Sequence, residues 1–301
     1  MPINLWLASA TLYRQAVEIL MGQQRPDRLP ARIALGESLM LHHVVSLDQL
    51  PSPEAGQSEV PAVFVDKHYE AIQRAVGLGW RTAWYNPHGG ISPERDPIQD
   101  VDLINLDSLP QVGIELDKKP SLAECLTWWE EWKVPENIRA HSRTVGRSAY
   151  HLAVMLRNKG LCVDPILVHR GGLLHDIDKI DTLKQSGGHG RMGADFLEAQ
   201  GYPALAEIVQ EHIMSTILHP GAADRAWEVK LVYFTDKLVE GDRLVSFERR
   251  LEALYERYPH YQETMEQAAG PVRALSDQIC SILSIPTHEN LISILIKLQN
   301  N

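Results

Sequence analysis

The spacing of hydrophobic and polar positions changes near residue 112, which predicts two regions of different architecture. In the first region three short apolar runs predict strands: PAVFVD (61–66), TAWYNP (82–87) and VDLINL (101–106). Residues 67–77, between the first two runs, follow a helical spacing instead. Strands that alternate with helices are typical of a parallel sheet. We therefore expect a small α/β layer with parallel strands over residues 1–112.

Residues 113–135 (GIELDKKPSLAECLTWWEEWKVP) have the pattern of a helical connector. Pro120 followed by Ser121 suits the start of a helix, and Pro135 suits its end. The segment also contains three tryptophans: Trp128, Trp129 and Trp132. They form either an amphipathic anchor or, as we favour, a set of large side chains that pack the two regions together.

Residues 136–301 follow a helical pattern throughout, which predicts an all-α domain. Helices are expected at about 137–158, 164–178, 190–200, 203–214 and 224–240, with two or more helices after them. Gly160 and Gly201 stand where glycines that terminate helices are expected. The expected fold class is thus α+β with two domains, a small α/β layer followed by a helical domain.

Six polar residues of the helical region occupy positions that the apolar pattern reserves for the interior: His141, His175, Asp176, His189, His212 and Asp236. His141, for example, shares a helix face with Val145 and Ala149. A single inward histidine is usually a core residue with a hydrogen bond. Six such groups together are costly, because each missing hydrogen bond costs about 1–3 kcal/mol. Bound cations would remove that cost.

Imidazole and carboxylate ligands suit borderline divalent or ferric ions, namely iron, manganese, zinc, cobalt or nickel, better than calcium or magnesium. Six ligands exceed what one catalytic ion takes while it keeps an open position, so we expect two ions with Asp176 as the bridge. Two such ions lower the pKa of a shared water and stabilise charge on a phosphoryl group. The expected reaction is hydrolysis of a phosphoester or phosphoanhydride by metal-activated hydroxide.

The order His141, His175-Asp176, His189, His212, Asp236 resembles the HD-domain superfamily of metal-dependent phosphohydrolases. LLHDIDK, HGRMGADFL, EHIMST and VYFTDKLVEG are most similar to the bacterial HD-type hydrolases of symmetrical dinucleoside tetraphosphates, over about residues 138–245. The resemblance implies an all-α HD-type fold and a nucleotide-type substrate. It also implies a first metal at His141, His175, Asp176 and Asp236, and a second at His189, His212 and the shared Asp176.

Two basic residues are candidates for substrate binding. Lys179 lies three residues after Asp176, so it could hold a phosphate at the mouth of the site and act in catalysis with Asp176. Its alternative role is a solvated lysine at a helix C-terminus. Arg191 is the second candidate.

The first region resembles the C-terminal half of a haloacid-dehalogenase-type domain, on the basis of Asp66, Gly79 and the RTAWYNP that follows. No DxDx(T/V) nucleophile segment precedes this half, and Ala71 stands where a second acid is expected. We therefore expect a non-catalytic remnant, with an ordinary α/β layer as the alternative.

Composition narrows the possible partners. The 301 residues suffice for two domains, and the formal net charge of −10 without a long basic run argues against binding of long nucleic acids. No stretch of the sequence reaches the roughly 18 apolar residues of a membrane span. The three cysteines lack CxxC spacing, which indicates a reducing compartment. We therefore expect a cytoplasmic protein. The expected partner is a small phosphorylated substrate; the oligomeric state stays open, a homo-oligomer included.

Two other functions fit the same residues. One is a non-catalytic module that binds and senses a nucleotide. The other is a di-iron oxygenase, since some HD-type folds use the same ligand types for oxidation.

Overall fold

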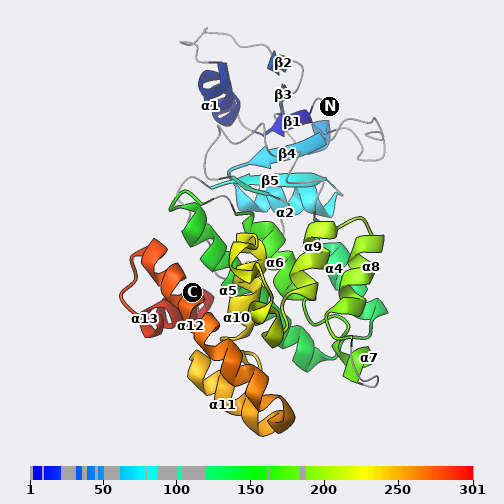
Figure 1. The fold of residues 1–301 in the computed structure, drawn as a ribbon. Coiled ribbons are helices and arrows are strands. Elements are labelled where there is room, and N and C mark those ends of the chain that lie inside the picture. The colour runs from blue at the N-terminus through cyan, green and yellow to red at the C-terminus, as the bar shows by residue number, and fades with distance from the viewer. Residues whose placement is uncertain are drawn as a thin grey trace. The chain divides into compact units, whose positions relative to one another are not determined.

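The computed structural model describes residues 3–8, 10–21, 32–35, 39–44, 47–50, 62–78, 80–86, 101–103, 119–161, 163–183 and 188–300 (Figure 1). Contacts divide the chain into two compact units. The first comprises residues 1–90 and 97–117, and the second comprises residues 91–96 and 118–301. This division falls after residue 117, whereas the sequence pattern placed the end of the first region at residue 112. Gly79 and residues 113–118 lie outside the described residues.

The first unit contains a six-stranded sheet with the order β2-β3-β1-β4-β5-β6. Its strands are β1 (Ile3–Leu7), β2 (Arg32–Leu35), β3 (Leu39–His43), β4 (Ala62–Asp66), β5 (Arg81–Tyr85) and β6 (Val101–Leu103). Every neighbouring pair is parallel except β2 and β3. The predicted parallel α/β layer is confirmed, and β1, β2 and β3 are strands that the pattern did not predict.

Two helices cover this sheet: α1 (Ala10–Met21) and α2 (Tyr69–Gly77). Successive side chains of a strand point to opposite faces. In β4, Phe64 joins a buried cluster with Tyr69 and Ile72 of α2, so Val63 and Val65, which are fully buried, face the other layer. A short 3-10 helix, η1 (Leu47–Gln49), follows β3.

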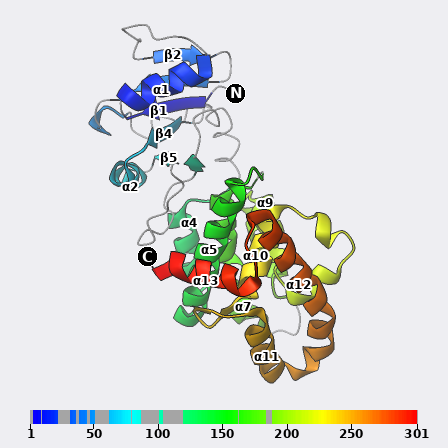
Figure 2. The same ribbon diagram turned by 90° about the vertical axis from the view of Figure 1, so that its left-hand side faces the viewer.

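The second unit is built from helices (Figures 1 and 2). They are α4 (Leu122–Glu131), α5 (Glu136–Arg157), α6 (Pro165–Leu174), α7 (Lys179–Leu183), α8 (Arg191–Ala199), α9 (Pro203–Gln210), α10 (Trp227–Asp236), α11 (Phe247–Arg257), α12 (Gln262–Leu283) and α13 (His288–Asn300). The short elements between them are η4 (Met214–Leu218), η5 (Ala222–Asp224), η6 (Pro259–Tyr261) and the hairpin β7 (Val239–Glu240) and β8 (Arg243–Leu244). The all-α prediction is confirmed. Three predicted helices end earlier than expected: those at 164–178, 203–214 and 224–240 end at Leu174, Gln210 and Asp236.

Helix α4 packs within the helical unit. Ser121 caps it as predicted, because the Ser121 hydroxyl accepts a hydrogen bond from the backbone N–H of Glu124 and the Glu124 carboxylate accepts one from Ser121. The indole of Trp129 donates to the carbonyl oxygen of Leu173 at 3.0 Å. Trp128 meets the ring of Phe196 edge-on. These contacts place Trp128 and Trp129 in the core of the second unit. The connector role of residues 113–135 stays a prediction.

Two glycines let α5 and α6 approach closely. A Cβ atom added to Gly172 of α6 would lie 2.7 Å from the backbone nitrogen of Gly146 in α5, closer than real Cβ contacts. The close contact is possible only because Gly172 has no side chain. It brings His141 in α5 next to His175, which follows α6, with their ring centroids 5.3 Å apart.

No described helix is by itself long and apolar enough to cross a membrane. The consecutive segments Pro259–Leu283 and His288–Gln299, which are bent by 70° relative to each other, reach the necessary length and apolar composition only when taken together.

Candidate metal centre

The six predicted ligands all lie at or near helix ends that converge in the helical unit. His141 is in the first turns of α5, His175 and Asp176 follow α6, His189 precedes α8, His212 follows α9, and Asp236 is the last residue of α10. Five of them are buried, and the side chain of His189 is 31% exposed. The structure therefore brings together every residue of the predicted set.

The six residues form two groups of candidate ligand atoms. The first triad is His141, His175 and Asp236, and the second triad is Asp176, His189 and His212. Within each triad the ligand atoms lie within 4.8 Å of one another. Asp176 spans both, since its Oδ1 is 3.0 Å from His189 Nε2 and its Oδ2 is 3.6 Å from His175 Nε2. This is the geometry that a bridging carboxylate requires.

Each of the four imidazoles uses its Nδ1 atom for a second hydrogen bond. The acceptors are the carbonyl oxygens of Gly241, Gly172 and Val209 for His141, His175 and His212, at 2.6 to 2.8 Å, and the Asp178 carboxylate for His189, at 2.8 Å. Because these oxygens only accept, each Nδ1 must carry the proton. In a neutral ring, Nε2 therefore presents a lone pair to the centre, as in metal sites whose histidines are oriented by a second hydrogen bond.

Acceptor atoms consequently face one another inside the cluster. His141 Nε2 lies 3.1 Å from the Asp236 carboxylate, and His189 Nε2 lies 3.2 Å from His212 Nε2. The buried Nε2 of His175 has no hydrogen-bond partner. Unsatisfied buried acceptors are unfavourable, and cations shared among them satisfy all of these atoms. A nitrogen and oxygen donor set of this kind fits borderline transition metals.

Residues 138–240 match the family model of the HD domain. An uncharacterized protein of Methanocaldococcus jannaschii is 35% identical to this chain over 134 residues. The alignment covers 38% of this chain and 78% of that protein. The chain belongs to the HD-domain family. No solved structure matches it. The HD domain is a family of metal-dependent phosphohydrolases, which supports metal-dependent hydrolase activity in general. The predicted superfamily is confirmed.

Both carboxylates of the HD-domain cluster are ionised. Burial alone would raise the pKa of Asp176, but the ammonium group of Lys179 and the nearby His175 lower that pKa well below its usual value. Burial likewise opposes ionisation of Asp236, and Lys237 is the main group that lowers its pKa. Lysine contacts thus keep two negative charges ready for cations in a buried site.

The two imidazoles of the second triad differ in charge. Burial lowers the pKa of His212 to about 4, so this ring is neutral near neutral pH. Burial also disfavours a proton on His189, but hydrogen bonds to Asp176 and Asp178 outweigh it and raise the His189 pKa to about 9. An ion that binds at His189 therefore replaces a proton there.

Asp178 is a functional residue that the sequence analysis missed. Its fully buried carboxylate accepts hydrogen bonds from His189 Nδ1 and from the backbone N–H groups of Gly190 and Gly193, at 2.8 to 3.2 Å. It thereby fixes the ring of His189 at the start of α8. The signal was present in LLHDIDKI, where a second aspartate follows the first within an apolar stretch.

A cavity of about 540 Å³ opens onto the centre, and we call it the site cavity. It is lined by Asp176, Lys179, Thr182, Gly188, His189, His212, Ile213, Met214, Ser215, Asp236, Lys237, Arg250, Leu254, Tyr258, Tyr261, Thr264 and Met265. Lys179 lies here as predicted. Arg191 is not among the described residues that line it: its side chain is 79% exposed on α8 and lies 3.9 Å from Asp195. Its role as a substrate contact stays a prediction.

Arg250 is a cation of the site cavity that sequence patterns did not reveal. It comes from α11, beyond the HD-domain match, and is 7% exposed. One of its terminal nitrogens lies 2.5 Å from the Glu240 carboxylate and the other 3.9 Å from Asp236. Its buried Nε has no hydrogen-bond partner. The guanidinium group therefore places a positive charge beside Asp236.

Proposed function

We propose that the protein is a metal-dependent phosphohydrolase that cleaves a phosphoester or phosphoanhydride bond of a small nucleotide-type substrate. The observation that carries this proposal is the pair of triads joined by Asp176 at the floor of the site cavity. Two ions bound there would lower the pKa of a water molecule and offset the charge on phosphoryl oxygens.

The chain's own residues have distinct roles in this proposal. Asp176 holds the two triads together. Lys179, whose Nζ lies 2.5 Å from Asp176 Oδ2, lines the cavity with a 29% exposed side chain, so it can bind a phosphoryl oxygen. Arg250 adds a second positive charge to the lining of the cavity. Lys237 is buried and holds Asp236 in place through a 2.5 Å contact.

The apolar and aromatic residues of the site cavity support a substrate with a ring system. Leu254, Tyr258, Tyr261 and Met265 belong to the lining, and Tyr261 is 56% exposed. Tyrosine rings offer flat apolar faces on which a nucleobase can stack. A cavity of about 540 Å³ is within the usual range of sites for such ligands. We propose a nucleotide with more than one phosphate, the symmetrical dinucleoside tetraphosphates included.

The first unit fits a non-catalytic, haloacid-dehalogenase-like remnant. Asp66 ends β4, as in the sequence pattern on which the resemblance is based, and the neighbouring strand β1 (INLWL) contains no acidic residue that could be a nucleophile. The Asp66 carboxylate accepts hydrogen bonds from the backbone and the ring of His68. Asp66→Asn is therefore expected to leave phosphohydrolase activity unchanged.

The test is phosphate release in anaerobic buffer with Mn²⁺, over nucleoside mono-, di- and triphosphates and dinucleoside polyphosphates. We expect turnover of at least one of them and its loss in Asp176→Asn. Nucleotide binding with no turnover of any substrate would favour a sensing module. Turnover that needs oxygen and ferrous iron would favour an oxygenase. Either result would overturn the proposal.

A further inference from the structure

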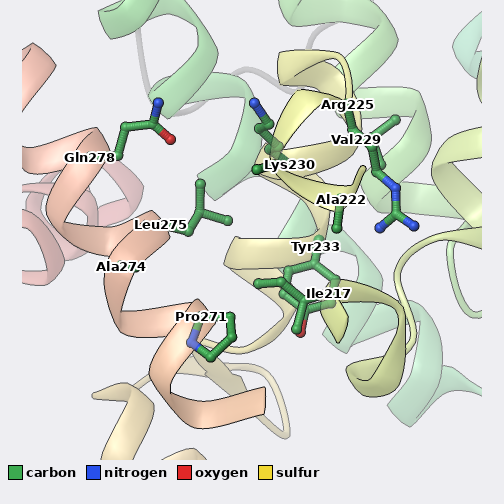
Figure 3. A pocket seen from close by; sticks show the side chains of 11 residues that line it. Ile217, Ala222, Arg225, Val229, Lys230, Tyr233, Pro271, Ala274, Leu275 and Gln278 are labelled. Carbon is green, nitrogen blue, oxygen red and sulfur yellow. The ribbon is translucent and has the colours of Figure 1, made fainter. Parts of the chain in front are cut away.

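A second cavity, of about 320 Å³, lies between α10 and α12 (Figure 3). Ile217, Val229, Tyr233, Pro271 and Leu275 give it an apolar lining. In Figure 3 the side chains of Leu275 and Gln278 extend from α12, and those of Lys230 and Tyr233 face them from α10. An apolar hollow with a few polar groups at its edge is the usual form of a small-molecule site.

The charged residues of this second cavity are both cations, Arg225 and Lys230. Arg225 is neutralised by Glu211, since its terminal nitrogen lies 2.5 Å from that carboxylate. Lys230 lies over the ring of Trp227 at 4.9 Å, and it has no ion pair with a carboxylate in the described part of the chain. The cavity thus offers one uncompensated positive charge beside an apolar hollow.

Three elements contribute residues to both cavities. Helix α12 supplies Met265 to the site cavity and Leu275 to the second cavity. The 3-10 helix η4 supplies Met214 to the site cavity and Ile217 to the second cavity. Helix α10 supplies Asp236 to the metal centre and Tyr233 to the second cavity. A ligand between α10 and α12 therefore contacts the elements that also shape the candidate active site.

Tyr233 provides the most direct link. Its ring lines the second cavity, and the ammonium group of Lys237 lies 4.6 Å from the centre of that ring. Lys237 in turn donates to the Asp236 carboxylate at 2.5 Å and to the carbonyl oxygen of His212 at 2.6 Å. The hydroxyl of Tyr233 donates to the carbonyl oxygen of Met214 at 2.9 Å. A shift of the Tyr233 ring would therefore displace Lys237, which contacts Asp236 of the first triad and the backbone of His212 of the second.

We propose that the second cavity binds a small organic anion with an apolar body, its anionic group near Lys230 and its carbon skeleton against Tyr233 and Leu275, and that this binding is coupled to the metal centre through Tyr233. The binding part goes beyond the proposed function. The coupling part rests on the metal centre alone and requires no turnover.

Binding is tested by titration calorimetry of the full chain with three probes. Octanoate combines a charge with a carbon chain, octanol keeps the chain without the charge, and acetate keeps the charge without the chain. We expect octanoate to bind, octanol to bind more weakly and acetate not to bind. Absence of octanoate binding would overturn the proposal, and equal affinities for octanoate and octanol would overturn the role assigned to the charge.

Variants locate the site. Ala274 is exposed and lines only the second cavity, so Ala274→Trp is expected to fold normally and to abolish octanoate binding. Lys230→Gln is expected to weaken binding about threefold, as for an exposed ion pair. Lys297→Gln, an exposed lysine of α13 outside the cavity, is the charge-matched control and is expected to bind like wild type. Unchanged binding in folded Ala274→Trp would place the ligand elsewhere and refute the proposal.

Coupling is tested by Mn²⁺ titration of chelator-treated protein with and without octanoate. Linkage requires that octanoate changes Mn²⁺ affinity by the same factor by which Mn²⁺ changes octanoate affinity. We expect a factor of at least about five, the lower end for coupled sites. Equal Mn²⁺ affinities would refute the coupling. A chain that fails in phosphate release but shows both effects would refute only the proposed function.

Discussion

His189 Nε2 and His212 Nε2 lie 3.2 Å apart, although the Nδ1 atom of each ring already donates to an oxygen. Two neutral rings in this arrangement direct lone pairs at each other. A proton on His189 relieves the contact, and so does an ion between the rings. The second triad is therefore built to hold positive charge in one form or the other.

The first prediction concerns metal content. Wild type is expected to bind about two Mn²⁺ ions per chain, and His141→Ala and His212→Ala are each expected to lose about one. Asp176→Asn is expected to weaken both sites, because its carboxylate spans the two triads. Elemental analysis after dialysis measures the content. His219→Ala, an exposed histidine outside the triads, serves as the control; equal metal loss in that variant would contradict the assignment.

The second prediction concerns Asp178. Asp178→Asn is expected to lower metal affinity about 10- to 100-fold, because His189 loses the carboxylate that orients its ring. Metal titration against a fluorescent chelator measures the change. Asp195→Asn, whose side chain is 75% exposed, is the matched control. If both variants bound metal like wild type, the orienting role of Asp178 would be refuted.

The third prediction concerns the basic residues and distinguishes those that bind substrate from one that does not. Lys179→Met and Arg250→Met are each expected to lower kcat/KM by about 10- to 100-fold, since each removes a charged hydrogen bond to phosphate. Arg191→Met is expected to retain wild-type kinetics, because this side chain is exposed outside the site cavity. Steady-state phosphate release is the measurement. A large loss of kcat/KM in Arg191→Met would instead support the predicted role of Arg191 in substrate binding.

The fourth prediction concerns the contact between α5 and α6. Gly172→Ala is expected to cost about 1–3 kcal/mol of unfolding free energy, because the new methyl group overlaps the backbone of Gly146. Metal binding should weaken as well, since the carbonyl oxygen of Gly172 orients His175. Urea denaturation measures the stability. In Gly77→Ala, where an added Cβ atom meets nothing within 4 Å, stability should change by less than about 1 kcal/mol.

The fifth prediction concerns pH. Burial, with a smaller contribution from Arg147, lowers the pKa of His151 from 6.5 to about 4. The unfolded chain therefore binds a proton between these pH values that the folded chain does not, so stability falls as pH decreases from 6.5 to about 4. The shift corresponds to about 3 kcal/mol at most. His151→Asn should lose less stability between pH 7 and pH 4.5 than wild type does in urea denaturation; an identical loss would contradict the prediction.

The helical unit could be predicted largely from the sequence because its helices have regular inward faces. That periodicity placed His141, His212 and Asp236 toward the interior, where the structure has them. The predicted C-terminal end of α6 was wrong, because the apolar spacing continues through LLHDIDKI while the backbone changes to tight turns after Leu174. His175 bonds the carbonyl oxygen of Gly172 there, a side-chain contact that competes with the helix.

The remaining parts of the site depend on contacts distant in sequence. Arg250 and Tyr261 reach the site cavity because α11 and α12 pack against the helices of the HD-domain match, and no local pattern encodes that packing. In the first unit, β1 and β3 are short runs that gain their stability from pairing with each other across 36 positions of the chain. Such pairing is invisible in a local window of sequence.

The ammonium group of Lys237 joins the two halves of the centre, since it contacts the carboxylate of Asp236 in the first triad and the carbonyl oxygen of His212 in the second. With only 4% of the residue exposed, it cannot release one partner and solvate freely. An ion that draws Asp236 into position therefore also steadies the segment that carries His212. We therefore expect the two proposed ions to load cooperatively, with a Hill coefficient above one.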